Sequence, residues 1–255
     1  MKRIRLTVAY DGTAYCGWQV QPNGITIEEV INRKLGGLTG EDITIIGASR
    51  TDSGVHALAN VAVFDSDTTI PPDRMAIALN QKLPDDIVII KSEEVLPDWH
   101  PRYQKNITKT YEYHVTNAPF PNPLKRLTSF FVSYHLDIGK MREAAGYIVG
   151  EHDFASFCNI RTNALTTVRR VDELSIRQEG EDITFRISGN GFLYNMVRII
   201  VGTLLRVGRG FYTPEQVKEI VEARNRKAAG VTVPPQGLVL VEIDYHEDET
   251  QKIEQ

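Results

Sequence analysis

The chain has 255 residues, of which 42% are hydrophobic, and a formal net charge of −4. This is enough apolar material to bury a core, which excludes disorder for most of the chain, and the presence of only two cysteines excludes a disulfide framework. No run of eighteen apolar residues occurs and Met1 leads into a strand pattern, so we expect a cytoplasmic protein with neither a signal peptide nor a membrane segment.

The first part of the chain predicts alternating strands and helices. Runs of β-branched residues predict the strands, and a proline in the first turn predicts the start of the second helix. In chain order we expect a strand over 4–10, a glycine-rich loop, a helix over 27–38, a strand over 43–46, a polar loop, a strand over 60–64, a helix over 72–82 and a strand over 87–93.

The second part follows a similar plan. We expect a strand over 110–116, a proline-rich connection over 118–123, a helix over 138–148, strands over 168–178 and 182–189, helices over 194–207 and 214–223, and a last strand over 238–246. This order predicts an α+β fold of two ferredoxin-like, RRM-like halves, whose strands form a mixed, mainly antiparallel sheet with the helices on one face. We place the halves at residues 1–104 and 105–246, followed by an acidic tail over 247–255.

The net charge argues against a nucleic-acid partner, but its distribution is uneven. Lys and Arg outnumber Asp and Glu between Arg161 and Lys227. This excess suits either an RNA-binding surface or a solvated surface of mixed charge. The basic stretch over 224–230 leaves the same two interpretations open.

The stretch from Gly47 to Ala57 sets one carboxylate, Asp52, between an arginine and a glycine-containing turn. Two predicted strands flank it, and polar loops on rigid scaffolds are where catalytic groups are usually found. Taken alone, however, such a string is more often a plain turn in which Arg50 pairs with the aspartate at the surface.

The same stretch resembles the Gly-Arg-Thr-Asp-x-Gly-Val-His-Ala signature of the TruA family of tRNA pseudouridine synthases. Further segments are similar to that family's motifs in the same order, at 10–21 with 26–29, 99–103, 109–113, 192–198 with 201–210, and 234–245. Two residues depart from the pattern: Ser49 stands where the family usually has glycine, and Asn60 where it often has glutamine. If the glycine were needed at this position because the backbone adopts a positive φ angle, Ser49 would be strained by about 1 kcal/mol or more.

The resemblance implies an enzyme that converts uridine to pseudouridine in the tRNA anticodon stem-loop, at positions 38, 39 and 40. It implies that Asp52 is the catalytic carboxylate and that Arg198 is its ion-pair partner. Tyr111 would stack on the extruded uracil, Leu193 would wall the pocket, and Arg50 would contact the RNA. The reaction needs no cofactor and no metal, and the resemblance also implies a homodimer with one tRNA spanning both subunits.

The chemistry of the residues agrees with these roles but leaves some of them open. A carboxylate can attack the sugar as a nucleophile or take a proton from it as a base, and the sequence does not choose. Arg198 lies in an apolar helix and therefore needs a partner. His56 either holds the target stem or caps a helix, Arg102 is a further candidate for substrate binding, and Trp18 is either a packing anchor or a contact to RNA or to a second subunit.

Other classes of function fit less well. A non-catalytic RNA-binding protein could keep the fold, but it would not need Asp52, Arg50, Tyr111 and Arg198 together. A glycoside hydrolase normally needs a second carboxylate, for which no partner motif is present. His152, Asp153 and Cys158 lack a further ligand at metal-binding spacing, and neither a P-loop nor a dinucleotide fingerprint occurs.

Overall fold

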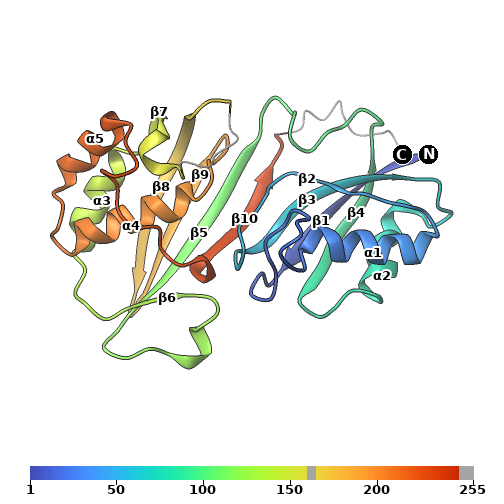
Figure 1. The fold of residues 1–255 in the computed structure, drawn as a ribbon, viewed down its shortest axis with the longest axis horizontal. Coiled ribbons are helices and arrows are strands. Elements are labelled where there is room, and N and C mark those ends of the chain that lie inside the picture. Colours follow the sequence, from blue (N-terminus) through green and yellow to red (C-terminus); the bar gives the residue numbers. More distant parts are fainter. Residues whose placement is uncertain (160–164, 247–255) are drawn as a thin grey trace. The chain divides into compact units, whose positions relative to one another are not determined.

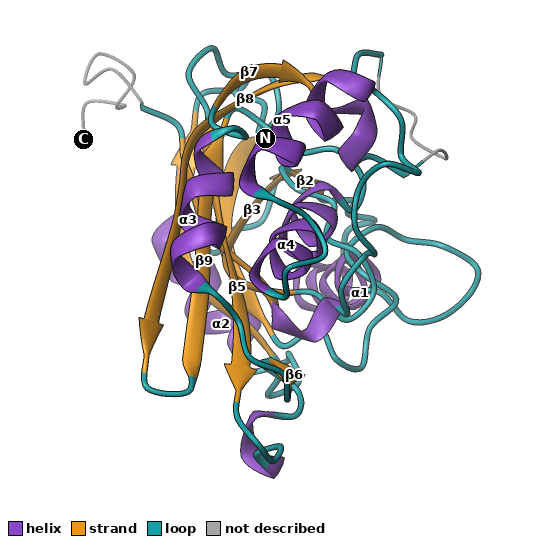
Figure 2. Ribbon diagram, turned by 90° about the vertical axis from the view of Figure 1, so that its left-hand side faces the viewer, coloured by secondary structure: helices purple, strands orange, loops and turns teal. Residues whose placement is uncertain are grey.

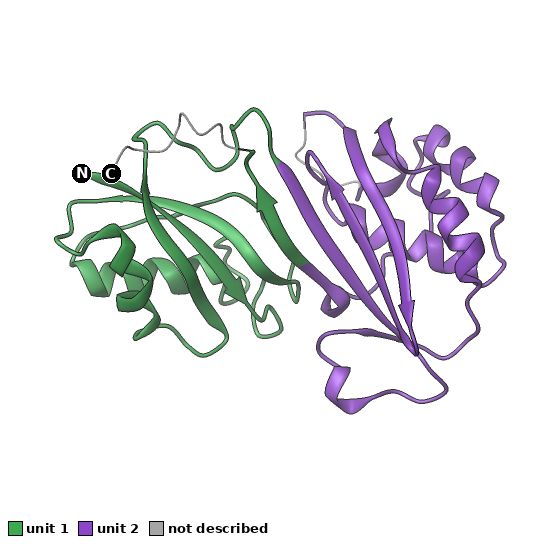
Figure 3. Cartoon of the chain, turned by 180° about the vertical axis from the view of Figure 1, so that it is seen from behind, with its two compact units in different colours: residues 1–107, 240–255 green, residues 108–239 purple. Residues whose placement is uncertain are grey.

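The computed structural model describes residues 1–159 and 165–246, so the acidic tail expected over 247–255 lies outside the described residues. The chain divides into two units (Figure 3). Unit 1 comprises residues 1–107 together with the segment that begins at Leu240, and unit 2 comprises Thr108–Val239. Each unit is described separately below.

Unit 1 has a sheet of strand order β4-β1-β3-β10, with the short β2 paired to β3 (Figure 1). In chain order its elements are β1 Lys2–Tyr10, α1 Ile27–Thr39, β2 Ile46–Gly47, β3 His56–Ser66, a 3-10 turn Pro72–Arg74, α2 Met75–Asn80, β4 Ile87–Val95 and β10 Leu238–Asp244. β1 runs antiparallel to both β3 and β4. Its side chains alternate between buried and half-buried, as expected for a strand with one face toward the core.

The helix α1 begins and ends where its sequence predicts. The Thr26 side chain accepts a hydrogen bond from the Glu29 N–H, and acidic residues fill the first turn, where they suit the helix dipole. The helix ends at Gly40, which adopts a left-handed conformation with φ 77°. Its buried face carries Val30, Ile31 and Leu35, which pack into the core of unit 1.

Unit 2 has a sheet of strand order β5-β9-β8-β7, and β6 pairs with β5 in parallel. Its elements are β5 Thr108–Asn117, a 3-10 turn Pro123–Lys125, β6 Phe130–Val132, α3 Ile138–Gly146, β7 Gly150–Asp153, a 3-10 turn Phe154–Phe157, β8 Val168–Glu179, β9 Asp182–Gly189, α4 Met196–Gly208, α5 Pro214–Ala223 and a 3-10 turn Pro235–Gly237. The helices α3, α4 and α5 lie on one side of the sheet (Figure 2). Every residue of α4 except Arg198 and Arg206 is buried, so α4 forms the centre of this unit's core.

The α+β class and the mainly antiparallel pairing that the sequence predicts are confirmed. Strand β5 pairs with β6 in parallel, whereas the pairs β1–β3, β1–β4, β2–β3, β5–β9, β7–β8 and β8–β9 are antiparallel. Among the described residues no helix is both long enough and apolar enough to cross a membrane, and no cluster of His, Cys, Asp or Glu is suited to hold a metal ion.

Some predicted elements differ from the structure. The strand expected over 43–46 is wrong for most of its length, because only Ile46 and Gly47 pair with β3. Ile43 and Ile45 are buried, but the Ile45 N–H donates to the side-chain oxygen of Asn32 at 2.9 Å instead of to a neighbouring strand. The helix expected over 72–82 is a 3-10 turn followed by the six residues of α2.

Candidate active site

The candidate catalytic residue Asp52 lies on the loop that joins β2 to β3. Asp52 is half-buried, the following residue Ser53 is exposed, and the chain turns at Gly54, whose φ is 76°. The Val55 N–H closes this turn on the Asp52 carbonyl at 3.1 Å. Asp52 therefore lies outside the fully buried core of unit 1.

Two buried side chains hold the backbone just before Asp52. The Asn60 amide is fully buried; its Oδ1 accepts from the Ser49 N–H at 3.3 Å, and its Nδ2 donates to the Ser49 carbonyl at 3.0 Å. The Tyr10 hydroxyl is 2.7 Å from Thr51 Oγ1 and 3.4 Å from Asn60 Nδ2. This network fixes residues 49–51 from β1 and β3, the two strands beneath the loop.

Ser49 is not strained by its backbone conformation. Among the described non-glycine residues, only Asn195, Arg224 and His246 have a positive φ. Ser49 therefore needs no glycine-like freedom, and the strain that a positive φ would impose is absent. Its backbone conformation is compatible with the serine that replaces the family's usual glycine.

The glycine-rich loop near the start of the chain packs against the Asp52 loop. The Trp18 backbone N–H donates to the Thr51 carbonyl at 3.1 Å, and the Ser53 hydroxyl donates to the Tyr15 carbonyl at 3.1 Å. The Trp18 side chain is fully buried, and a Cβ atom on Gly47 would lie 2.3 Å from its indole nitrogen. Trp18 is thus a packing anchor, which excludes the alternative that it contacts RNA or a second subunit.

His56 begins β3, so of the two alternatives for this residue the one in which it caps a helix is wrong. The Gly12 N–H donates to His56 Nδ1 at 3.1 Å, and Asp11 Oδ1 lies 3.1 Å from the same nitrogen. A neutral ring accepts from Gly12, whereas a protonated ring pairs with the carboxylate. Burial opposes ionisation of Asp11, but hydrogen bonds from Thr13 and the nearby imidazole outweigh it and lower the pKa of that carboxyl.

Arg102 and Arg50 add positive charge near the same loop. The Arg102 Nε donates to the Gly47 carbonyl at 2.6 Å, which ties residue 102 to the end of β2. Burial, together with the charge of Arg50, lowers the pKa of the Arg102 guanidinium. Arg50 itself is exposed. Next to them, the exposed ring of Tyr103 stacks on His100 with centroids 4.2 Å apart.

The aromatic candidate Tyr111 lies in β5 of unit 2. Its ring is 8% exposed and meets Phe192 edge to face, with centroids 5.3 Å apart. Leu193, the other predicted pocket residue, is also buried. Tyr113 lies two residues on, fully buried, and its hydroxyl donates to the Pro234 carbonyl at 2.7 Å. Burial raises the pKa of Tyr113, so this residue is a neutral structural anchor.

Arg198 lies in the first turn of α4 and is held on two sides. Its Nε donates to the Val233 carbonyl at 2.8 Å, and its Nη1 donates to Asn195 Oδ1 at 2.7 Å. Asn195 precedes the helix in a left-handed conformation with φ 62°, which asparagine tolerates better than most residues. The arginine is half-buried in an otherwise buried helix, and Asn195 fixes the direction of its side chain.

The predicted site residues fall into two groups. Arg50, Asp52, His56 and Arg102 belong to unit 1, and the first three lie on one loop and the strand that follows it. Tyr111, Leu193 and Arg198 belong to unit 2. Tyr10 and Asn195 were not among the predicted site residues, and Asn60 was noted only as a departure from the family pattern and not as a support for the loop. Asn60 could have been found, because a polar residue interrupts an otherwise apolar strand.

Comparisons with known proteins agree on one family. A family model described as tRNA pseudouridine synthase matches residues 6–104 and 144–246. The tRNA pseudouridine synthase A of Acetivibrio thermocellus is 48% identical over 96% of this chain and 100% of that protein. The tRNA pseudouridine synthase A 2 of Clostridium perfringens is 47% identical over the same shares. A solved archaeal box H/ACA sRNP Nop10-Cbf5 complex aligns over 88% of this chain and 59% of that chain, at 15% identity and a TM-score of 0.37, which is too weak a likeness to carry an argument.

Proposed function

Because the chain belongs to the tRNA pseudouridine synthase family, we propose that it isomerises uridine to pseudouridine in the anticodon stem-loop of tRNA, at positions 38, 39 and 40. The observation that carries the proposal is the Asp52 loop itself. It retains the arginine, threonine, aspartate and glycine of the family signature, and buried hydrogen bonds hold its backbone in place.

The reaction is an internal exchange of bonds. The bond from N1 of the uracil to C1′ of the ribose breaks, and a bond from C5 to C1′ forms. The proton on C5 leaves and N1 takes one up, so no electrons are exchanged and no cofactor is required. Asp52 assists this exchange as nucleophile or as base, and it can also stabilise positive charge that develops at C1′.

The remaining roles follow the family resemblance. We assign Arg198 as the cation that pairs with Asp52 in the reacting complex, and Tyr111 as the ring that stacks on the extruded uracil, with Leu193 beside it. Extrusion of a base costs a few kcal/mol, and stacking on an aromatic ring returns about 1–3 kcal/mol. Arg50, Arg102 and His56 are assigned to contacts with the RNA around the target uridine.

Release of tritium from C5-labelled uridine in tRNA tests the assignment of Asp52. We expect wild-type protein to release tritium and Asp52→Asn to lower turnover by a factor of about 10² or more, since a positioned acid–base group contributes about that much. The matched control is Asp73→Asn, which removes an exposed carboxylate from the 3-10 turn before α2. No release by wild-type protein would refute the function, whereas release that persists in Asp52→Asn would refute only this residue's role.

We also propose that the protein acts as a homodimer in the cytoplasm. The family resemblance supports the dimer, and the two cysteines, both free thiols, suit a reducing compartment. Light scattering on the purified protein should give twice the chain mass of 28.7 kDa. A monomer that releases tritium at full rate would refute the dimer and leave the enzymatic function intact.

A further inference from the structure

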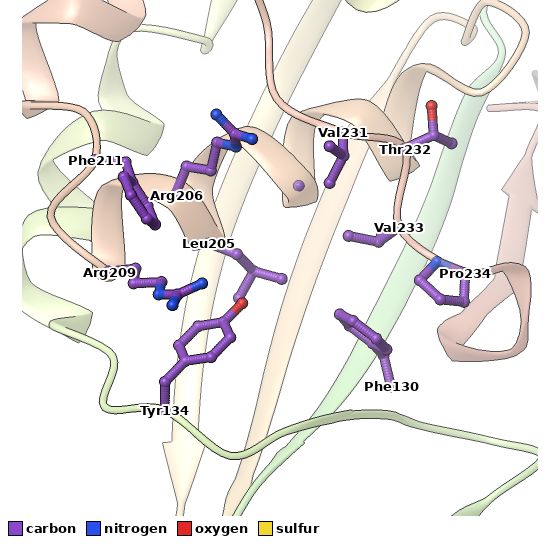
Figure 4. Close-up of a pocket in the computed structure, with 11 residues that line it drawn as sticks. Phe130, Tyr134, Leu205, Arg206, Arg209, Phe211, Val231, Thr232, Val233 and Pro234 are labelled. Carbon is purple, nitrogen blue, oxygen red and sulfur yellow. The ribbon is translucent and has the colours of Figure 1, made fainter.

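A pocket of about 260 Å³ lies in unit 2, between α4 and the segment that runs from Val231 to Pro234 (Figure 4). The two walls are in direct contact at one end, because a Cβ atom on Gly202 would lie 1.9 Å from the Val231 carbonyl oxygen. Leu205 and Val233 provide apolar side chains between the walls, and Phe130 lines the side near β6. No residue that lines the pocket is acidic.

Arg206 of α4 and Arg209, which directly follows the helix, line the pocket with their charges held against aromatic rings. The Arg209 guanidinium carbon lies 4.4 Å from the centroid of the Tyr134 ring and 4.9 Å from that of Phe211. The Arg206 guanidinium carbon lies 5.7 Å from the centroids of both Phe211 and Tyr212. In Figure 4 the two arginines flank the Phe211 ring. Stacking of this kind orients a guanidinium while its N–H edge stays available for an acceptor.

These cations have no carboxylate partner within residues 1–159 and 165–246. The Arg206 side chain makes one long hydrogen bond, from Nη1 to the Tyr212 hydroxyl at 3.4 Å, and the Arg209 side chain makes no hydrogen bond within the described part of the chain. A third arginine, Arg226, donates to the Gly230 carbonyl and to Thr232 Oγ1, and Thr232 lines the pocket. Arg226 also has no ion pair within the described residues.

These three arginines have no carboxylate partner among the residues that the structure describes, although the net charge of the chain is −4. Elsewhere in unit 2, Arg170, Arg177, Arg186 and Arg224 each pair with a carboxylate. Oriented N–H donors with no internal carboxylate suit an oxyanion from outside, and the fork of arginine matches phosphate oxygens. The apolar side chains between the walls suit the face of a planar group. Phosphate beside a planar apolar group is the chemistry of a nucleotide.

We propose that this pocket is a nucleotide-binding subsite that holds one unstacked nucleotide of the substrate RNA, other than the uridine that reacts. Its base lies against the apolar side chains, and its phosphate accepts hydrogen bonds from Arg206 and Arg209. A pocket of this volume is at the small end of ligand sites in proteins, which suits one base and not a duplex. RNA bases are recognised in this way where they are unstacked from a helix. This inference rests on the proposed function, since it takes the occupant to be the enzyme's own RNA substrate.

The test compares arginine variants of the full-length chain by equilibrium binding of an unmodified tRNA transcript. We expect Arg209→Gln and Arg206→Gln each to weaken binding about tenfold and to make it less dependent on salt, because each contact to single-stranded phosphate contributes about 0.7 to the salt slope. The matched control is Arg177→Gln on β8, which removes an exposed arginine that pairs with Glu179, and it should change binding less than twofold.

Four results would overturn the proposal. If Arg177→Gln weakened tRNA binding as much as the pocket variants do, the arginines would act only through general electrostatic attraction to RNA. A change in the oligomeric mass of Arg209→Gln would identify the pocket as a contact between copies of the chain. The protein could instead bind free uridine monophosphate or adenosine monophosphate saturably. If Arg209→Gln abolished that binding and left tRNA binding unchanged, the ligand would be a free nucleotide. Unchanged binding of every probe would mean that the pocket has no such ligand.

A second measurement separates this proposal from the proposed function. Transcripts that carry 5-iodouridine should crosslink on irradiation to Tyr134 or Phe211, and mass spectrometry identifies the modified peptide. If wild-type protein crosslinks at these rings but releases no tritium, the proposed function fails and the subsite stands. If it releases tritium and crosslinks at neither ring, the subsite fails and the function stands.

Discussion

At the scale of single residues, the placement of Asp52 depends on an asparagine that is not itself a catalytic candidate. Asn60 is completely buried and uses both ends of its amide: Oδ1 accepts from the N–H groups of Ser49 and Val61, and Nδ2 donates to the Ser49 carbonyl and to Tyr10. Such a network is strong when every member is satisfied and costly when one partner is lost.

Asn60→Leu should therefore destabilise the protein and impair turnover. The substitution leaves the buried Ser49 N–H and carbonyl without hydrogen-bond partners. Each unpaired group costs about 1–3 kcal/mol, so we expect a loss of about 2–4 kcal/mol in the free energy of unfolding. Urea denaturation measures this loss. The control is Asn106→Leu, at an exposed position, which should change stability by less than about 0.5 kcal/mol. Wild-type stability and turnover in Asn60→Leu would show that the network does not hold the loop.

Much of the candidate site could be predicted from its residues, but not its support. Asp52, Tyr111 and Arg198 each lie in a segment that resembles a motif of the family, which is why they could be selected as candidates. Their assigned roles stay predictions. The role of Tyr10 could not be predicted, because it depends on the register of β1 against β3, which shifts between Val8 and Tyr10. Nor could the sequence decide the φ angle at Ser49.

At the scale of elements, Gly47 at the end of β2 allows the Asp52 loop to lie close to the first motif. Its missing side chain leaves room for the Trp18 indole, and its carbonyl accepts from Arg102. This one position joins β2, the glycine-rich loop and the segment around Arg102. The packing of these three elements around the Asp52 loop therefore depends on the absence of a side chain at position 47.

Gly47→Ala should destabilise unit 1, whereas Gly37→Ala should not. A Cβ at position 47 would lie 2.3 Å from a fully buried indole, and overpacking of this kind costs about 1–3 kcal/mol. Gly37 lies inside α1 with nothing within 4 Å of the added atom, and alanine favours a helix over glycine by about 0.5–1 kcal/mol. Thermal unfolding of the two variants should shift in opposite directions. A shift in the same direction would contradict the packing described here.

The β1–β3 ladder contains a cross-strand ion pair that should depend on pH. Arg3 and Asp65 are direct partners and form two hydrogen bonds, of 2.8 and 2.6 Å. The hydrogen bond from Arg3 lowers the pKa of Asp65 below its ordinary value, so the pair stabilises the fold above that value. This contribution is lost as the pH falls from about 4 through the lower pKa of the folded state.

Asp65→Asn should cost about 0.5–1 kcal/mol at pH 7, as expected for a cross-strand pair at the surface. The difference from wild-type protein should shrink as the pH falls from about 4 through the lowered pKa of Asp65. Urea denaturation across this range measures it, and Asp73→Asn, which removes an exposed carboxylate, is the control. A difference that persists at low pH would mean that packing, and not the ion pair, holds these two residues.

The elements that were missed share a physical reason. β6 has only three residues and follows a proline-rich loop, so no alternation could reveal it. β7 is polar and glycine-containing, and it lies at the edge of its sheet against β8 alone. The run from Ile43 was predicted as a strand because its residues are β-branched and buried. The hydrogen bond from the Ile45 backbone to Asn32 is a tertiary interaction that no local pattern encodes.

At the scale of the whole molecule, the alternation of strands and helices was sufficient to predict the α+β class. The family match covers residues of both units, and the residues proposed to act on uridine also come from both. The overall charge carries little information about the partner, since the chain is acidic while arginines without carboxylate partners gather around one pocket of unit 2. Charge distribution, not net charge, agrees with an RNA substrate.

The most direct test of the central claim maps pseudouridine in an unmodified tRNA transcript after incubation with the purified protein alone. A transcript with uridines at positions 38, 39 and 40, and others elsewhere, is digested after the reaction, and mass spectrometry combined with chemical labelling of pseudouridine locates the product. We expect pseudouridine within the anticodon stem-loop at these positions, without added metal or cofactor, and none with Asp52→Asn. Absence of pseudouridine with wild-type protein, or its formation only outside the anticodon stem-loop, would contradict the account.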